Sequence, residues 1–194
     1  MTNKKIRVLA DCSVMLALAF ALSCAKLFEM PLGGSVTVAS MLPIMLISVK
    51  YGVRTGLPTA FAYSLTQALQ ALVAGNVFPY CQTAGVLILC ILLDYVVPFT
   101  LLGLSGIFKQ TQLIKKSEVS VYLGMILSVA LRFICHFTTG VAIWDQWAPE
   151  GMGKYLYSFL YNGTFLGADL VICLVAAALM LRYTEIRKIL GLTA

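Results

Sequence analysis

The chain has 194 residues, of which 60% are hydrophobic and only 11% are charged, and its mean hydropathy is +0.92. Soluble domains carry roughly a quarter charged residues, so this composition excludes an ordinary soluble protein and indicates an integral membrane protein. The formal net charge of +6 does not indicate a nucleic-acid partner, because the basic residues lie between hydrophobic runs, where orientation signals belong. The six cysteines form no CxxC pair, so we predict neither a metal site nor a disulfide framework, and we expect no cofactor.

The N-terminal segment combines a basic start, an apolar run and small residues, as a secretory signal peptide does. However, the segment ALSC that ends at Cys24 is a poor cleavage sequence, and the apolar run continues through Leu27 and Phe28. We therefore expect this segment to be retained as a first membrane helix.

Helix-length apolar runs recur along the chain, and a membrane-spanning helix needs about 20 mostly apolar residues. Because the runs are not short alternating strands, they favour a helical bundle over a β-barrel. The fold class that we predict is an all-α integral membrane protein in which residues 1–194 form one transmembrane domain. Its six transmembrane helices, of which the second is short, are expected at residues 8–28, 39–53, 56–75, 81–108, 119–143 and 157–181.

Basic residues gather in alternate connections between these runs. One set of connections contains Lys4, Lys5, Arg7, Lys50, Arg54, Lys109, Lys115, Lys116, Arg182, Arg187 and Lys188. The other set contains Glu29, Asp145, Glu150 and a single clear basic residue, Lys154. Because positive charge marks the cytoplasmic side, both termini are predicted to be cytoplasmic.

The most informative segment is 132–162, which holds the only histidine and both tryptophans. Arg132, His136, Gly140 and Trp144 follow one another at intervals of four and therefore share one helix face. A tryptophan and tyrosine belt at the membrane surface is the alternative interpretation. Such a belt explains neither the arginine nor the histidine, and an ionisable residue inside a membrane span indicates a functional site.

A second polar pair, Asp94 and Tyr95, interrupts the fourth apolar run. A charge at that depth costs at least ~2.5 kcal/mol on insertion scales, so Arg132, His136 or a cationic ligand must hold Asp94. Together with Trp144, Tyr157 and Asn162, these residues are predicted to line a pocket that opens to the outside. An anion among aromatic faces favours a ligand that is both cationic and aromatic.

An intramembrane serine protease is the competing hypothesis, because the segment from Gly103 to Gly106 has the pattern GxSG. Ser105 lies close to cytoplasmic Lys109, whereas His136 lies 18 residues beyond Glu118. At the helical rise these side chains differ in depth by roughly 20 Å, and catalysis needs about 3 Å. We therefore interpret Ser105 as a packing residue and do not expect an enzyme.

A strip of small residues, Ser13, Ala17, Ala21 and Ala25, follows the first helix at every fourth position. Small residues allow a second helix to approach closely in lipid. The partner helix could belong to this chain or to another protein.

The pattern H-F-x-x-G-x-x-x-W-x-Q-W-A from His136 to Ala148, followed by Y-S-x-x-x-N-G from Tyr157, resembles the ThiT family. These proteins are the thiamine-specific S components of energy-coupling-factor (ECF) vitamin transporters. The segments 94–95, 103–108 and 42–52 are similar to the family as well. The resemblance covers nearly the whole chain.

This resemblance implies a thiamine-binding subunit of the plasma membrane that docks on a transmembrane coupling subunit and two ATPase subunits. It implies docking through Ser13, Ala17 and Ala21. The ligand-contacting residues that it implies are Asp94, Tyr95, His136, Trp144, Tyr157 and Asn162. In this picture the acidic residue neutralises the thiazolium, the tryptophan and histidine sandwich a ring, and the tyrosine and asparagine bind the aminopyrimidine.

Two departures from the family pattern concern the ligand. Asp94 stands where we expect a glutamate, which shortens the acidic side chain by one methylene. The loop around Gly33 and Gly34 lacks the tryptophan that can stack on the ligand, and Phe28 and Trp147 are the candidates to compensate for it. The ligand can therefore be thiamine or a relative such as its pyrimidine precursor.

Overall fold

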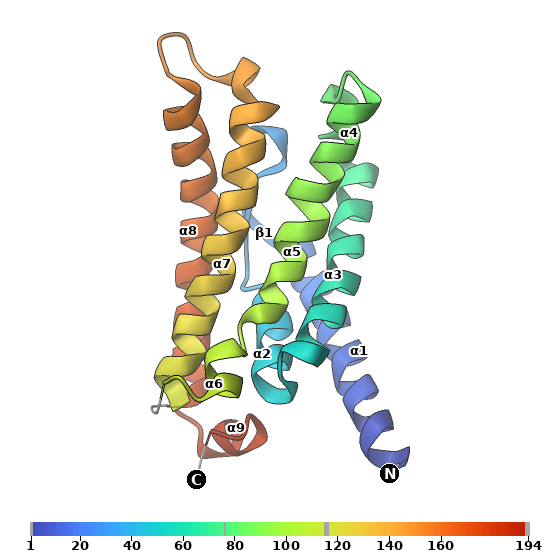
Figure 1. The fold of residues 1–194 in the computed structure, drawn as a ribbon, viewed down its shortest axis with the longest axis vertical. Helices are drawn as coiled ribbons and strands as arrows, with labels where there is room; N and C mark the ends of the chain where they lie inside the picture. Colours follow the sequence, from blue (N-terminus) through green and yellow to red (C-terminus); the bar gives the residue numbers. More distant parts are fainter. Residues whose placement is uncertain (1, 76, 115–116, 193–194) are drawn as a thin grey trace.

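The computed structural model describes residues 2–75, 77–114 and 117–192, so Lys115 and Lys116 of the predicted charge pattern lie outside the described residues. Long helices run side by side along the longest axis of the molecule, and both ends of the chain lie at the same end of the bundle (Figure 1). The principal helices are α1 (Thr2–Cys24), α3 (Val53–Ala74), α7 (Ser117–Ala142), α8 (Lys154–Leu181) and a broken helix between Ala84 and Thr111.

Four described helices are long and apolar enough to cross a membrane: Asn3–Cys24, Ala84–Thr111, Glu118–Ala142 and Lys154–Leu181. They correspond to the first, fourth, fifth and sixth predicted spans and confirm a multi-pass, all-helical membrane protein. Helix α3 matches the third predicted span in position, with 22 residues. Helix α2 (Leu42–Tyr51) has only ten residues, eight of them buried, so it is too short to cross a bilayer alone.

The first helix ends earlier than the sequence predicts. Helix α1 stops at Cys24, and Lys26–Glu29 forms strand β1, which pairs antiparallel with β2 (Ser35–Thr37). The predicted span 8–28 is therefore wrong at its outer end. In the hairpin the backbone N–H and C=O groups of this segment pair between strands instead of within a helical turn. The turn that joins the strands includes Gly33 at φ 91°, a conformation that glycine adopts readily.

The fourth span is a chain of short helical pieces. Helix α4 (Ala84–Cys90) continues into the π-helical turn η3 (Ile91–Val96), α5 (Val97–Thr100), the 3-10 turn η4 (Leu101–Leu104) and α6 (Ile107–Thr111). A π turn carries an extra residue relative to an α-helical turn and is frequent at functional sites. This turn contains both Asp94 and Tyr95.

Small residues bring elements near the end of the bundle that carries both termini into close contact. A Cβ atom on Gly103 would lie 2.6 Å from the backbone of Gly56, and one on Gly124 would lie 1.8 Å from the carbonyl oxygen of Ser105. Ser105 is fully buried, and its hydroxyl donates to the carbonyl of Met45 at 2.9 Å. It acts as the packing residue that the sequence predicts.

Helix α1 buries one face and leaves the other free. Ala19 and Ser23 are buried against the bundle, whereas Ser13, Ala17 and Ala21 are exposed. In Figure 1 the first turns of α1 diverge from the other helices. The small-residue strip therefore lies on an outer surface of the described bundle.

Candidate functional site

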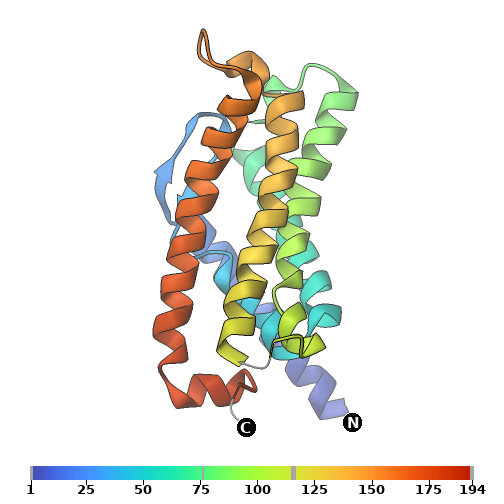
Figure 2. The same ribbon diagram turned by 60° about the vertical axis from the view of Figure 1, so that its left-hand side comes forward.

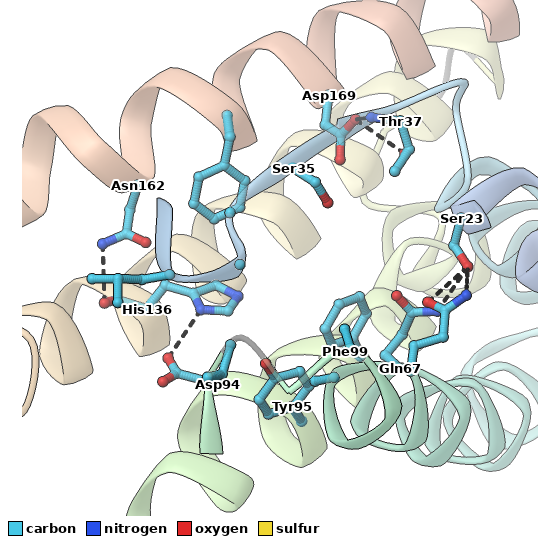
Figure 3. Close-up of a pocket in the computed structure, with 18 of the residues that line it drawn as sticks. Ser23, Ser35, Thr37, Gln67, Asp94, Tyr95, Phe99, His136, Asn162 and Asp169 are labelled. Atoms are coloured by element: carbon cyan, nitrogen blue, oxygen red, sulfur yellow. Dashed lines mark hydrogen bonds and ion pairs between the residues drawn. The ribbon is translucent and has the colours of Figure 1, made fainter. Parts of the chain in front are cut away.

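A cavity of about 510 Å³ lies among the β-hairpin, α3, the π turn η3, α7 and α8. Its polar side chains come from several elements and converge on the same space (Figure 3). All six residues that the sequence singled out line it: Asp94, Tyr95, His136, Trp144, Tyr157 and Asn162. The fold therefore brings the predicted set together.

Asp94 is the centre of a buried hydrogen-bond cluster. One carboxylate oxygen accepts from the Thr139 hydroxyl and lies 3.1 Å from Nδ1 of His136. The other oxygen accepts from Nε1 of Trp144 at 3.0 Å. The carboxylate is thus held by three donors and by no lysine or arginine among the described residues, which corrects the expectation that Arg132 could hold it.

The protonation pattern of His136 follows from its second neighbour. Arg132 Nε donates to His136 Nε2 at 3.2 Å, and a guanidinium can only donate. His136 Nε2 must then be the acceptor, so the imidazole proton sits on Nδ1 and points to Asp94. The imidazole in this arrangement is neutral, and the negative charge of Asp94 is left without a cationic partner.

Asn162 lines the cavity and also makes hydrogen bonds within the bundle. Its amide nitrogen donates to the backbone carbonyls of His136, at 3.1 Å, and Ser158, at 2.9 Å. Close packing makes these bonds possible, because a Cβ on Gly140 would lie 2.1 Å from the Ser158 hydroxyl. The bond to His136 ties α8 to α7, the bond to Ser158 lies within α8, and the carbonyl oxygen of Asn162 is the part left for a ligand.

The hairpin closes one side of the cavity through a residue that the sequence analysis missed. The Tyr161 hydroxyl donates to the carbonyl of Pro31 and accepts from the Gly34 N–H, the latter at 3.1 Å. A Cβ on Gly34 would lie only 2.8 Å from that hydroxyl. Helical spacing offered a signal for two missed residues. Tyr161 is four residues after Tyr157 and Thr139 is three residues after His136, so each shares a helix face with a predicted site residue.

The two tryptophans have different environments. Trp144 lies two residues beyond Ala142, the last residue of α7, and is only 8% exposed. Trp147 is 45% exposed and meets the ring of Tyr80 edge-on, with 5.2 Å between the ring centroids. Neither Trp147 nor the exposed Phe28 lines the cavity. The expectation that one of them compensates for the missing loop tryptophan is therefore wrong for this conformation.

A second polar region lies across the cavity from Asp94. Asp169 accepts from the backbone N–H of Thr37 at 2.7 Å and from its hydroxyl at 3.2 Å. Arg132 is 6% exposed, and its guanidinium stacks on Phe99 at 3.9 Å from the ring centroid. Both charged residues line the cavity.

Ser105 and His136 do not form a pair, because the side-chain partners of His136 are Asp94 and Arg132 while Ser105 is bonded to Met45. In the described ranges no three His, Cys, Asp or Glu side chains gather as a metal site. A bundle of membrane-crossing helices around a cavity of aromatic and hydrogen-bonding side chains defines a membrane protein that binds a small organic molecule.

The chain belongs to the thiamine transporter protein family (Thia_YuaJ), whose sequence model matches residues 9–189. This is a family of transport proteins and not of enzymes. The thiamine transporter ThiT of Bacillus subtilis is 32% identical over 189 residues, which cover 92% of each chain. ThiT of Lacticaseibacillus paracasei is 24% identical over 191 residues, covering 92% of this chain and 89% of the relative.

The fold is similar to the solved structure of ThiT from Listeria monocytogenes. The TM-score is 0.75, and the similarity covers 97% of this chain and 99% of the other at 21% sequence identity. This likeness supports the arrangement of the helices.

Proposed function

We propose that this protein is the substrate-binding S subunit of an ECF-type importer and binds thiamine in the cavity around Asp94. The observation that carries the proposal is the Asp94 carboxylate, which is 8% exposed and held by neutral donors only. A buried carboxylate of this kind favours a cationic partner. The thiazolium of thiamine is permanently cationic and needs no proton exchange to serve as that partner.

The charges around the cavity agree with a ligand that carries one positive charge. Among the described residues that line it, the charged side chains are Lys26, Asp94, Arg132 and Asp169. Lys26 is neutralised by Glu29 at 2.7 Å. Two carboxylates then face one guanidinium, and the excess negative charge matches a monocation.

The size and the walls of the cavity suit two linked aromatic rings. A volume of about 510 Å³ lies within the range of small-molecule sites. Tyr95, Trp144, Tyr157 and Phe165 offer ring faces and edges on different sides, and aromatic faces stabilise cations. The carbonyl oxygen of Asn162 can accept from the amino group of the pyrimidine.

The remaining parts of the proposal concern transport. Residues 1–194 act as a single transmembrane domain in the plasma membrane, with both termini in the cytoplasm and the cavity toward the outside. The loaded protein docks on a transmembrane coupling subunit that is driven by two ATPase subunits. The exposed strip of Ser13, Ala17 and Ala21 is the proposed docking surface, since small residues permit close helix contact.

Calorimetric titration of the purified protein in detergent tests the ligand. We expect saturable binding at micromolar thiamine or below. The Trp147→Phe variant leaves Trp144 as the sole tryptophan, and its fluorescence should be quenched in parallel with the heat. Absence of both signals would refute thiamine binding.

The pyrimidine precursor is the second candidate ligand, because the loop at Gly33–Ser35 lines the cavity without a tryptophan. This precursor lacks the thiazolium and its charge. If it binds more tightly than thiamine in the same titration, the protein is an S component for the precursor and Asp94 does not act on a cation.

A further inference from the structure

Arg132 is an unusual group for the interior of a membrane protein. It is 6% exposed, and no carboxylate oxygen of the described chain lies within 4.0 Å of its guanidinium. Its partners are Nε2 of His136 at 3.2 Å, the thioether of Met41 at 2.9 Å and the ring of Phe99. A guanidinium carries five N–H donors, so most of them have no hydrogen-bond acceptor among the described residues.

The opposite wall provides a matching acceptor. One oxygen of Asp169 is occupied by Thr37, through its backbone N–H and its hydroxyl. The second oxygen has no hydrogen bond in the described structure and points into the cavity (Figure 3). Ser35 and Ser40 line the cavity nearby and are also polar. This region therefore presents a cationic donor and an anionic acceptor that do not pair with each other.

We propose that Arg132 and Asp169 form a second polar subsite, which binds a hydroxyl group of the ligand and discriminates against the phosphate ester of that hydroxyl. A hydroxyl can accept from the guanidinium and donate to the free oxygen of Asp169 at the same time. A phosphate ester could accept from Arg132, but it would bring negative charge toward a buried carboxylate, and like charges in such a site repel strongly.

The guanidinium of the proposed subsite lies close enough to Asp94 for one ligand to reach both groups. His136 bridges the two, with Nδ1 on Asp94 at 3.1 Å and Nε2 on Arg132 at 3.2 Å. The Asp94 carboxylate and the Arg132 guanidinium are thus separated by one imidazole ring and two hydrogen bonds. One five-membered ring with a two-carbon arm spans a similar length, and the thiazolium of thiamine carries a hydroxyethyl arm. The inference rests on the proposed function and specifies which form of the ligand the site selects.

Three ligands test the subsite on the wild-type protein by calorimetric titration. They are thiamine, an analogue with an ethyl group in place of the hydroxyethyl group, and thiamine monophosphate. We expect the ethyl analogue to bind at least about tenfold more weakly, as for loss of a hydrogen bond to a charged group, and the monophosphate to bind more weakly still. If thiamine binds and the other two bind equally well, the subsite is refuted and the proposed function survives. If thiamine does not bind, both proposals fail.

Two variants then assign the discrimination to its residues. Asp169→Asn keeps an oxygen for Thr37 and removes the charge, so it should narrow the preference for thiamine over the monophosphate by about tenfold or more. Arg132→Gln should bring thiamine and the ethyl analogue to nearly equal affinity. Matched controls on exposed positions, Asp145→Asn and Arg182→Gln, should retain the wild-type ratios.

A purely structural role gives a different result. If Arg132 and Asp169 only hold the bundle together, their variants lower the affinity for all three ligands by the same factor, and the subsite is refuted. Asp94→Asn provides the reference for such a uniform loss, because all three ligands carry the thiazolium.

Discussion

Replacement of Asp94 by asparagine tests the central electrostatic argument. The substitution preserves the shape of the side chain and one acceptor oxygen, while it removes the negative charge. The charge is 8% exposed and has no cationic partner in the described chain, so screening by solvent is weak. A charge-assisted contact contributes about 1.5–3 kcal/mol, and thiamine should therefore bind about 10- to 150-fold more weakly.

The structure identifies a second effect that must be separated from the first. Nε1 of Trp144 donates to one oxygen of Asp94 at 3.0 Å, and His136 and Thr139 approach the other. An amide cannot accept on both sides, so at least one of these bonds is lost whichever way the asparagine is oriented. That loss weakens every ligand, whether or not the ligand is charged.

A thermodynamic cycle isolates the charge. Thiamine and an uncharged deaza analogue are titrated by calorimetry into the wild type and Asp94→Asn. The local rearrangement cancels between the two ligands, and the remaining coupling reports the contact between carboxylate and thiazolium. We expect thiamine to lose most of its advantage over the analogue in the variant. Equal losses for both ligands would show that Asp94 is structural, and Asp145→Asn, in the exposed loop, controls for charge removal alone.

Three further predictions address the ring contacts, the partner surface and the packing. Trp144→Ala should abolish most thiamine binding and quenching because this side chain lines the cavity, while Trp147→Ala should leave both nearly unchanged, and the reverse result would contradict the site. Ala17→Trp should leave the affinity for thiamine in detergent intact and abolish thiamine uptake in cells that carry the coupling and ATPase subunits. A loss of affinity for thiamine would instead show that the small-residue strip packs inside this protein's own bundle. Gly140→Ala should destabilise the protein by about 1–3 kcal/mol, seen as a lower thermal midpoint, because its Cβ would meet a hydroxyl of α8 at 2.1 Å; Gly85→Ala, with open space around it, should not.

Sequence periodicity predicted the part of the site that lies on one regular helix. Arg132 and His136 are four residues apart and do interact. The charge cost of Asp94 called for a partner among Arg132, His136 and a cationic ligand, and the structure shows the contact with His136. These predictions succeed because a helical repeat is a local property. The interpretation of Ser105 as a packing residue succeeded for a similar reason, since depth follows from the helical rise.

The features that were missed depend on contacts between distant parts of the chain. Nothing local in Lys26–Glu29 distinguishes a strand from the last turn of a membrane helix, and the hairpin exists because it pairs and packs on α8. The role of Asn162 as a tie between α7 and α8 depends on the close approach at Gly140. The π turn at Asp94 shifts the helical register by one residue, which no regular helical wheel anticipates.

The bond between Thr37 and Asp169 also constrains how the protein is made. It joins a strand near the start of the chain to the final long helix, 132 residues later, so at ribosomal rates roughly 10 s of synthesis separate the two partners. Figure 2 shows the hairpin lying against α8 and forming a wall together with it. The earlier helices are therefore synthesised before α8 is present, and the wall that the hairpin forms with α8 is incomplete during that time. The cavity is complete only when α8 arrives, because α8 supplies part of its lining.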